Sequence, residues 1–319
     1  MLKIPGRYIG DAWYYVDDGT AHCYFLTQPD STSLNERGLH WDTGHAISTN
    51  LVDWEFVGLA MSRGMPGEWD GHKLSTGSVI KRDGRFWMAY NAQDFGKYEV
   101  PPRERRQSNI QRVGVAVSDD LYNWIKYEDN PVSEADPDIY QMDGTWRDPF
   151  MVEMDDRVYH YVCAAPSKND VSSVGTVGLA WTNDMLNWNI EPPVKTDAVA
   201  KRMEVPQVYK IGNLYYLNFC TSTGWLLDDF KNQHPSHEFG NADYSMVSES
   251  PMGPFKMYGT GEIFPTDSKL IPYASQLINW KGEWVLLGTA MHARRGIGPD
   301  FVIDPVPIEA TEEGIRAKL

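Results

Sequence analysis

Three acidic residues stand at corresponding places in three repeats of the chain. Asp11 and Glu204 each lie eight residues before the glycine of a tight turn, and Asp148 lies eight residues before Asp156 in a third such turn. The residues between acid and turn form a short predicted β-strand, and a second predicted strand follows each turn. Because repeats superpose, we expect the three carboxyl groups to face a common axis. Carboxyl groups gathered around one axis are what glycoside cleavage requires, since one donates a proton and another attacks or activates water.

The repeat that carries these acids recurs five times. Each copy has a tight-turn signal followed by a strand rich in aromatic and aliphatic residues, at intervals of roughly 55–75 residues. The predicted second strands are residues 21–28, 85–92, 157–165, 213–221 and 283–290. Five repeats of four antiparallel strands predict an all-β, five-bladed β-propeller. We expect a single domain over residues 1–319, with few helices because Pro and Gly interrupt every long stretch.

A second motif, Asp/Asn-Leu/Met-x-x-Trp, follows the predicted third strand of the first three repeats. Its tryptophans are Trp54, Trp124 and Trp188. We expect each of them to pack between neighbouring blades. Residues 301–303 are expected to complete a blade where the ring closes.

The direction of the strands predicts where the acids lie. Neighbouring strands of a blade run antiparallel, so the start of the first strand and the loop between the second and third share one end of the ring. Two long insertions, residues 91–112 and 222–243, occupy that loop in blades two and four and are expected to rise beside the acids. The predicted ring of residues at this end reads Asp11, Thr76, Asp148, Glu204 and Ala274. Acids lining a water-filled channel are the alternative to a reactive site.

Composition excludes some functions. A net charge of −15 argues against nucleic acid, whose phosphates require a basic surface. The three cysteines, Cys23, Cys163 and Cys220, fall in second strands and are expected to be buried free thiols. No Cys/His spacing fits structural zinc, so no metal or other cofactor is predicted. No apolar signal or membrane-spanning run is present, and a cytoplasmic protein without a membrane or nucleic-acid partner is expected. An oligomer is compatible with the sequence but is not indicated by it.

Four short motifs, in order along the first four blades, carry a resemblance to a known family. Trp146-Arg147-Asp148-Pro149 is similar to an Arg-Asp-Pro motif, and Met203-Glu204-Val205-Pro206 is similar to Glu-Cys-Pro. Residues 44–54 look like the family's first-blade turn, and residues 75–78 look like Phe-Ser-Gly-Ser. Together the motifs resemble glycoside hydrolase family 32, the β-fructofuranosidases, over almost the whole ring.

The resemblance implies a role for each acid. Asp11 would be the nucleophile, Glu204 the general acid and then base, and Asp148 the stabiliser of the cationic transition state. Arg147 would orient a carboxylate or a sugar hydroxyl, the alternative being an ion pair with a neighbouring blade. The remaining candidates for sugar binding are Thr76, Trp13, Trp69 and Tyr273, with core packing as the alternative for the aromatic ones.

Departures from the family pattern leave the sugar open. The family's first motif, Asn-Asp-Pro-Asn-Gly, is replaced by Gly10-Asp11-Ala12-Trp13, and Leu26 stands where a Gln is expected. Val205 replaces the Cys of Glu-Cys-Pro, and Ser75 replaces the Phe of Phe-Ser-Gly-Ser. No C-terminal β-sandwich is expected within this chain.

Three hypotheses for function follow. The first is a retaining exo-glycosidase that removes a terminal furanosyl unit, a fructofuranoside being the first candidate. The second is an inverting arabinofuranosidase or xylosidase of family 43, in which the two carboxyl groups would be ~6.5–9.5 Å apart instead of ~5–5.5 Å. The third is a non-catalytic propeller that binds glycans.

Overall fold

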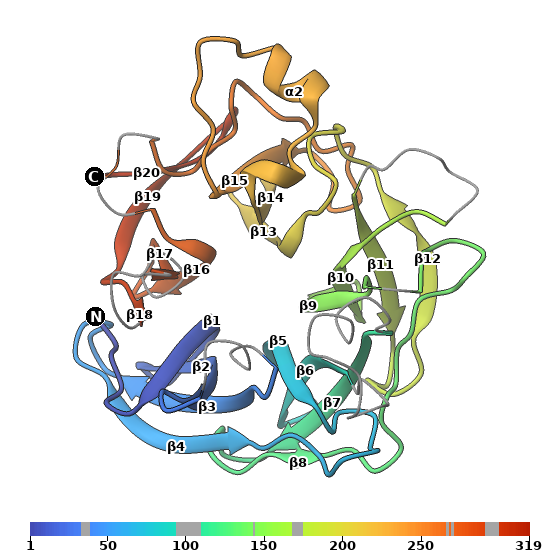
Figure 1. The fold of residues 1–319 in the computed structure, drawn as a ribbon, viewed down its shortest axis with the longest axis vertical. Coiled ribbons are helices and arrows are strands. Elements are labelled where there is room, and N and C mark those ends of the chain that lie inside the picture. Colours follow the sequence, from blue (N-terminus) through green and yellow to red (C-terminus); the bar gives the residue numbers. More distant parts are fainter. Residues whose placement is uncertain are drawn as a thin grey trace.

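The strands form five sheets around one axis (Figure 1). The structure is a computed structural model that describes residues 1–32, 39–93, 110–142, 144–167, 175–265, 268, 271–290 and 300–319. The first three blades have four antiparallel strands each. Blade one contains β1 (Arg7–Asp17), β2 (Thr20–Pro29), β3 (Asp42–Ser48) and β4 (Glu55–Met61). Blade two contains β5 (Lys73–Arg82), β6 (Arg85–Gln93), β7 (Arg112–Ser118) and β8 (Ile125–Lys126), and blade three contains β9 (Arg147–Met154), β10 (Arg157–Ala164), β11 (Thr176–Thr182) and β12 (Asn189–Val194).

The last two blades are less regular. Blade four has β13 (Glu204–Ile211), β14 (Leu214–Thr221) and β15 (Ala242–Ser248), and isolated bridges from β15 to Lys256 and Glu262 take the place of its fourth strand. Blade five has β16 (Tyr273–Trp280), β17 (Glu283–Ala290), β19 (Val306–Thr311) and β20 (Gly314–Ala317), and β18 (Phe301–Val302) also pairs with β17. The predicted five-bladed propeller is confirmed.

The two ends of the described chain meet in blade five. The backbone of Leu2 exchanges two hydrogen bonds with Val302, each 3.0 Å long. The prediction that residues 301–303 complete a blade is therefore confirmed for β18. The bridge joins the segment that precedes β1 to blade five.

Five large hydrophobic clusters hold the ring together, one at each boundary between neighbouring blades, and a sixth, small cluster lies between blades four and five. Between blades one and two, for example, Trp13 and Tyr24 pack with Leu74 and Tyr90, and all four are buried. Burying a large apolar side chain contributes about 1.5–3 kcal/mol. The core is thus a set of side-chain layers between sheets, which fixes each blade against the next.

The three tryptophan turns are built alike. The indole N–H of Trp54, Trp124 and Trp188 donates to the carbonyl oxygen three residues earlier, at 3.0–3.1 Å. Each tryptophan is partly buried against one of the clusters between blades. The predicted packing role is confirmed.

Helices are scarce among the described residues, as predicted. The 3-10 turn η1 (Thr223–Trp225) and the short helix α2 (Asp228–Asn232) lie in the insertion of blade four. No helix in the described ranges is long and apolar enough to span a membrane. The three cysteines are buried and form no disulfide, as predicted.

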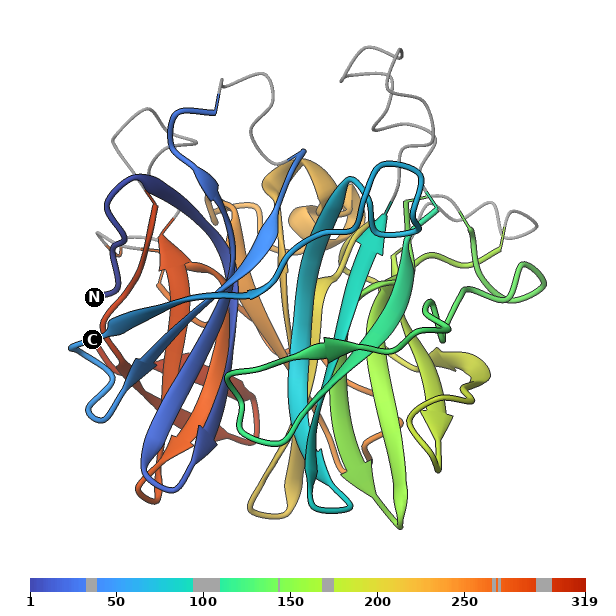
Figure 2. The same cartoon turned by 90° about the horizontal axis from the view of Figure 1, so that it is seen from below.

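The ring has two distinct ends. Figure 2 shows the hairpins between first and second strands at one end, and α2, the yellow-orange coil, nearer the end where the inner strands begin. The insertion 222–243 therefore lies on the expected end. Of the other insertion, residues 94–109 lie outside the described residues.

Candidate active site

Every inner strand carries a β-bulge near its start. In each blade, two residues of the first strand face one residue of the second. A bulge bends the strand and re-aims the side chains next to it. The bulged pairs are Gly10 and Asp11, Ser75 and Thr76, Asp148 and Pro149, Val205 and Pro206, and Ala274 and Ser275.

These bulges correct the prediction that the three acids share one slot. Asp11 is the second bulged residue of its blade, Asp148 is the first of its own, and Glu204 directly precedes its bulge. A count of eight residues back from the turn misses these differences for two reasons. Blade one has one more residue between bulge and turn than blades three and four, and Gly212 is the first residue of its turn whereas Gly19 and Asp156 are the second. The acids therefore spread over three successive positions of the same local structure.

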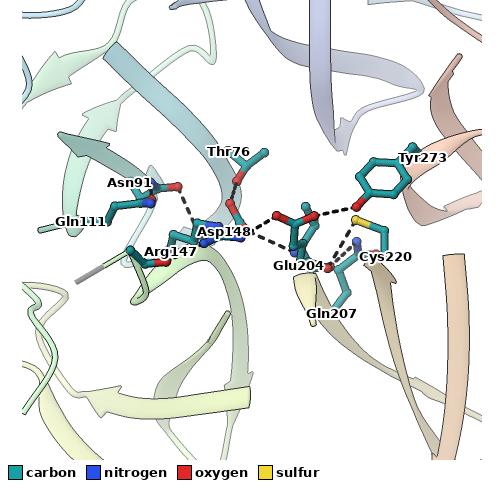
Figure 3. Close-up of polar contacts among 11 residues, drawn as sticks. Thr76, Asn91, Gln111, Arg147, Asp148, Glu204, Gln207, Cys220 and Tyr273 are labelled. Carbon is teal, nitrogen blue, oxygen red and sulfur yellow. Dashed lines mark hydrogen bonds and ion pairs between the residues drawn. The ribbon is translucent and has the colours of Figure 1, made fainter. Parts of the chain in front are cut away.

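The residues directly before the bulge contact one another across three neighbouring blades. They are Arg147 in β9, Glu204 in β13 and Tyr273 in β16. Arg147 Nη2 lies 2.5 Å from Glu204 Oε1, and the hydroxyl of Tyr273 donates to Glu204 Oε2 at 2.6 Å (Figure 3). The carboxylate of Glu204 is thus held from both sides by the equivalent residues of the adjoining blades. Arg147 both orients a carboxylate and forms an ion pair between blades.

Asp148 is the most enclosed of the three acids. Its side chain is 8% exposed and lies 3.3 Å from the Nε atom of Arg147. The hydroxyl of Thr76 donates to Oδ1, and the backbone N–H of Val205 donates to Oδ2 at 3.2 Å. Hydrogen bonds to a carboxylate oxygen are short and strong, so they hold the group firmly in place. Asp148 is therefore suited to present a fixed negative charge.

Asp11 is partly exposed and lies near the other acids. Burial raises the pKa of the Cys220 thiol well above its usual range, and the charges of Asp243, Glu204, Asp11 and Asp148 raise it further. One thiol thus experiences the charges of all three predicted acids. The structure brings Asp11, Asp148 and Glu204 to one region of the ring.

Two groups in this region keep their protons. Burial, together with the charges of Cys220 and Glu204, holds the pKa of Tyr273 well above its usual range, so its hydroxyl remains a donor. Burial disfavours the charge on Arg147, but the charges of Cys163, Glu204 and Asp148 outweigh it and keep the guanidinium pKa high. The site therefore combines three acids with one fixed cation and one neutral phenol.

The other predicted sugar-binding residues have mixed outcomes. Thr76, Arg147 and Tyr273 contact the acids, as described above, and their role in sugar binding stays a prediction. The prediction for Trp13 is wrong, because its ring is fully buried and stacks on Tyr24 with centroids 6.2 Å apart. Trp69 packs against Tyr90, with ring centroids 5.6 Å apart, and its role as a pocket wall stays a prediction.

Sequence reasoning missed a fourth carboxyl group, that of Asp243. It is 2% exposed, faces Cys220 in the β14–β15 ladder and accepts a hydrogen bond from the backbone N–H of Ser275 at 3.2 Å. Burial raises its pKa to about 7, and the charge of Asp11 adds to this effect against the opposing hydrogen bonds from Ser275 and Ala274. The only signal in the sequence was its place at the end of the insertion 222–243.

Asn91 was also missed. It is fully buried on β6, and its Oδ1 atom accepts a hydrogen bond from the backbone N–H of Asp148 at 3.1 Å. In the sequence it marked only the beginning of the other insertion, since a single Asn carries no recognisable motif.

Comparison with known proteins gives the family. The profile of the glycosyl hydrolases family 32 N-terminal domain matches residues 12–269. An invertase of Kluyveromyces lactis is 22% identical over 298 residues, which is 86% of this chain and 43% of that protein. A 6(G)-fructosyltransferase of Asparagus officinalis is 27% identical over 186 residues, covering 55% of this chain and 27% of that protein. The matches thus span about a quarter to less than half of these relatives.

Solved structures share the fold. An inulosucrase from Halalkalicoccus jeotgali bound to kestose superposes with a TM-score of 0.75 at 18% identity, covering 98% of this chain and 87% of that chain. A family 32 β-fructofuranosidase of Bombyx mori gives a TM-score of 0.70 at 17% identity, covering 99% and 65%. These superpositions show the propeller fold alone, whereas the profile match over residues 12–269 shows the family: the chain belongs to glycoside hydrolase family 32.

Proposed function

We propose that the chain is a retaining glycoside hydrolase that removes terminal furanosyl units. Membership in family 32 supports glycoside cleavage. Relatives named invertase, β-fructofuranosidase and fructosyltransferase support a fructofuranoside as the first substrate to test. The replaced residues around Asp11 leave room for a different furanosyl unit.

In the proposed first step, Asp11 attacks the anomeric carbon of the terminal sugar. The bond to the glycosidic oxygen breaks, and Glu204 gives that oxygen its proton, so a covalent glycosyl-enzyme forms. In the second step a water molecule attacks the same carbon. Glu204 accepts the proton of this water, and Asp11 is released as a carboxylate.

Asp148 forms no bond in this scheme. Thr76 and Val205 engage its two oxygens, so the carboxyl group is already fixed in position when positive charge develops on the sugar ring. Such preorganised charge stabilises the transition state more than the ground state. Arg147 and Tyr273 hold the acid–base residue Glu204 in position.

The contacts of Glu204 and Asp148 are the observation that carries the proposal. A propeller that only binds sugars would use its carboxylates to accept hydroxyl hydrogen bonds. Within the described part of the chain, Thr76, Val205, Arg147 and Tyr273 donate to these two acids, which fits side chains held in place for catalysis better than free acceptors held for binding.

The test is a substrate screen on the purified chain. Sucrose, fructan-type oligosaccharides and aryl furanosides are each incubated with the wild type and with Asp11→Asn, and sugar release is measured. We expect release by the wild type alone. No turnover of any substrate, or equal turnover by the variant, would contradict the proposal.

Product analysis separates the remaining alternatives. Retention of anomeric configuration, followed by NMR at early times, supports the double displacement, whereas inversion supports the family 43 type of mechanism. At high sucrose concentration, products longer than the substrate would show that a sugar, and not only water, accepts the glycosyl unit. The names of the fructosyltransferase relatives give the reason to look for them.

A further inference from the structure

The backbone around Asp148 has an uncommon conformation. Trp146 and Asp148 have φ angles of +63° and +60°, which lie in the left-handed region that residues other than glycine rarely adopt. Such a conformation costs free energy and persists only where the surrounding structure holds it. The question is which contacts hold Asp148.

Blade two supplies two of these contacts. From the bulge of β5, the hydroxyl of Thr76 holds the carboxylate of Asp148. From the adjacent strand β6, Asn91 Oδ1 accepts a hydrogen bond of 3.1 Å from the backbone N–H of Asp148. One residue therefore fixes the side chain and the other fixes the backbone (Figure 3).

A second amide orients Asn91. Its Nδ2 atom donates to Gln111 Oε1 at 2.9 Å, and Gln111 directly precedes β7. Because the N–H of Asp148 requires an acceptor, the oxygen of Asn91 must face it and the nitrogen must face Gln111. Gln111 in turn presents the acceptor that this nitrogen needs. The two amides have one mutually consistent arrangement.

We propose that Asn91, oriented by Gln111, is a positioning residue that keeps the backbone of Asp148 in its left-handed conformation and so places the carboxylate between Thr76 and Val205. The inference rests on the proposed function, because it assigns a catalytic purpose to that placement. Asn91 touches neither substrate nor reacting atoms and acts through Asp148.

Kinetics of Asn91→Ala provide the first test. We expect kcat and kcat/KM to fall together by about 100-fold, the cost of misplacing a catalytic group by about 1 Å. KM is expected to stay nearly unchanged, since the lost interaction operates in the transition state. Gln111→Glu keeps an acceptor for Asn91 and is expected to lose less activity than Gln111→Met, which removes it.

Asn130 offers a matched control. It is a partly buried amide of the same blade, and it exchanges hydrogen bonds of 2.8 Å with the backbone of Val115. Asn130→Ala is expected to lower the melting temperature at least as much as Asn91→Ala while leaving kcat unchanged. An equal fall of kcat in both variants would overturn the proposal, because general loosening of blade two would then explain the loss.

A crystal structure of Asn91→Ala tests the placement independently of activity. We expect Asp148 to leave the left-handed region and its carboxylate to lose its contact with Thr76 or Val205. If the wild type cleaves no glycoside, the proposed function fails while this measurement still decides the positioning role. An unmoved Asp148 would overturn the proposal. If Asn91→Ala does not fold, the same structural measurement is made on Gln111→Met, with the same two outcomes.

Discussion

The hydroxyl of Tyr273 donates a hydrogen bond of 2.6 Å to Glu204 across the boundary between blades four and five. Tyr273 and Glu204 occupy the same position before the bulge in their own strands, so the contact follows from the repeat itself. Because burial raises the pKa of Tyr273, the proton stays on the phenol. Glu204 is therefore oriented by one neutral donor and by the cation of Arg147 on its other side.

Removing this donor should disturb catalysis more than folding. Tyr273→Phe leaves the ring in place but frees one oxygen of Glu204 from its anchor. A hydrogen bond to a charged group contributes about 1.5–3 kcal/mol, which corresponds to roughly a 10- to 150-fold loss in kcat/KM. Steady-state kinetics on the substrate found in the screen measure the loss.

Tyr216 provides the control for this variant. Its hydroxyl donates to the backbone oxygen of Thr311 at 2.9 Å, away from the acids. Tyr216→Phe is expected to lower the free energy of unfolding by about 0.5–1.5 kcal/mol and to leave kcat unchanged. If Tyr273→Phe were as active as Tyr216→Phe, the hydroxyl would have no part in orienting Glu204.

Glu204→Gln tests the acid–base role directly. The amide cannot give a proton to the leaving oxygen, so we expect kcat to fall by about 100- to 10,000-fold. The fall in kcat/KM, which reports the first step alone, should be smaller on aryl furanosides, whose leaving groups depart without a proton, than on sucrose-type substrates. Unfolding in urea should show little change in stability. An equal fall of kcat/KM on both substrate types would remove Glu204 from the acid role.

Thr76→Val tests whether the charge of Asp148 must be held by protein donors. The substitution keeps the shape of the side chain but removes the hydroxyl that donates to Asp148. We expect kcat/KM to fall roughly 10- to 150-fold, from about 1.5–3 kcal/mol for a lost hydrogen bond to a charge. Thr76→Ser, which retains the hydroxyl, should recover most of the activity, and failure of this recovery would point to packing instead.

The sequence was sufficient to predict the ring and to predict that three acids gather at one end of it. Repeated turns and strands predicted five blades, and the three acids do lie together at the predicted end. It was not sufficient to predict the position of each acid within its strand, because a count of residues does not reveal a β-bulge. Asp11, Asp148 and Glu204 therefore occupy three different positions around their bulges, instead of one.

The same local feature explains the failure at Trp13. Alternation along a strand tells which side chains share a face, but a bulge at Gly10 and Asp11 resets that alternation. Trp13 is directed into the boundary between blades one and two, where it packs with Tyr24. Asn91 and Asp243 were missed for another reason: each acquires its role only from a residue of a neighbouring blade.

Buried histidines should make the fold sensitive to acid. Burial lowers the pKa of His160 to about 3, and burial with the charge of His22 lowers the pKa of His45 to about 3. Below about pH 6.5 the unfolded chain binds a proton at each of these sites while the folded chain does not, so stability falls between pH 6.5 and 3. At pH 5 each histidine is expected to lower the free energy of unfolding by about 2 kcal/mol relative to neutral pH.

His160→Phe isolates one of these contributions. The ring of His160 stacks on Trp188 with centroids 4.1 Å apart, and phenylalanine retains an aromatic ring there without a titrating group. We expect the loss of unfolding free energy between pH 7 and pH 5 to be about 2 kcal/mol smaller than in the wild type. Denaturant unfolding at both pH values measures the difference, and parallel losses in the two proteins would contradict the linkage.

Asp243 should have the opposite dependence on pH. Its pKa is raised to about 7 in the folded protein, first by burial and then by Asp11, whereas an unfolded aspartate titrates near pH 3.9. Between these values the unfolded chain releases its proton and the folded chain retains it. Stability contributed by this site is therefore full below about pH 3.9 and is lost as the pH rises toward 7.

Asp243→Asn removes this loss of stability at higher pH, because the amide resembles the protonated acid and cannot ionise. At pH 7 the variant is expected to exceed the wild type in unfolding free energy by about 2–4 kcal/mol, and the excess should shrink toward zero near pH 4. Asp119, whose side chain is 76% exposed, supplies the control, and Asp119→Asn should change stability by less than about 0.5 kcal/mol at either pH. A gain for Asp243→Asn that is the same at pH 4 and pH 7 would arise from packing, because only titration of the buried carboxyl group makes it grow with pH.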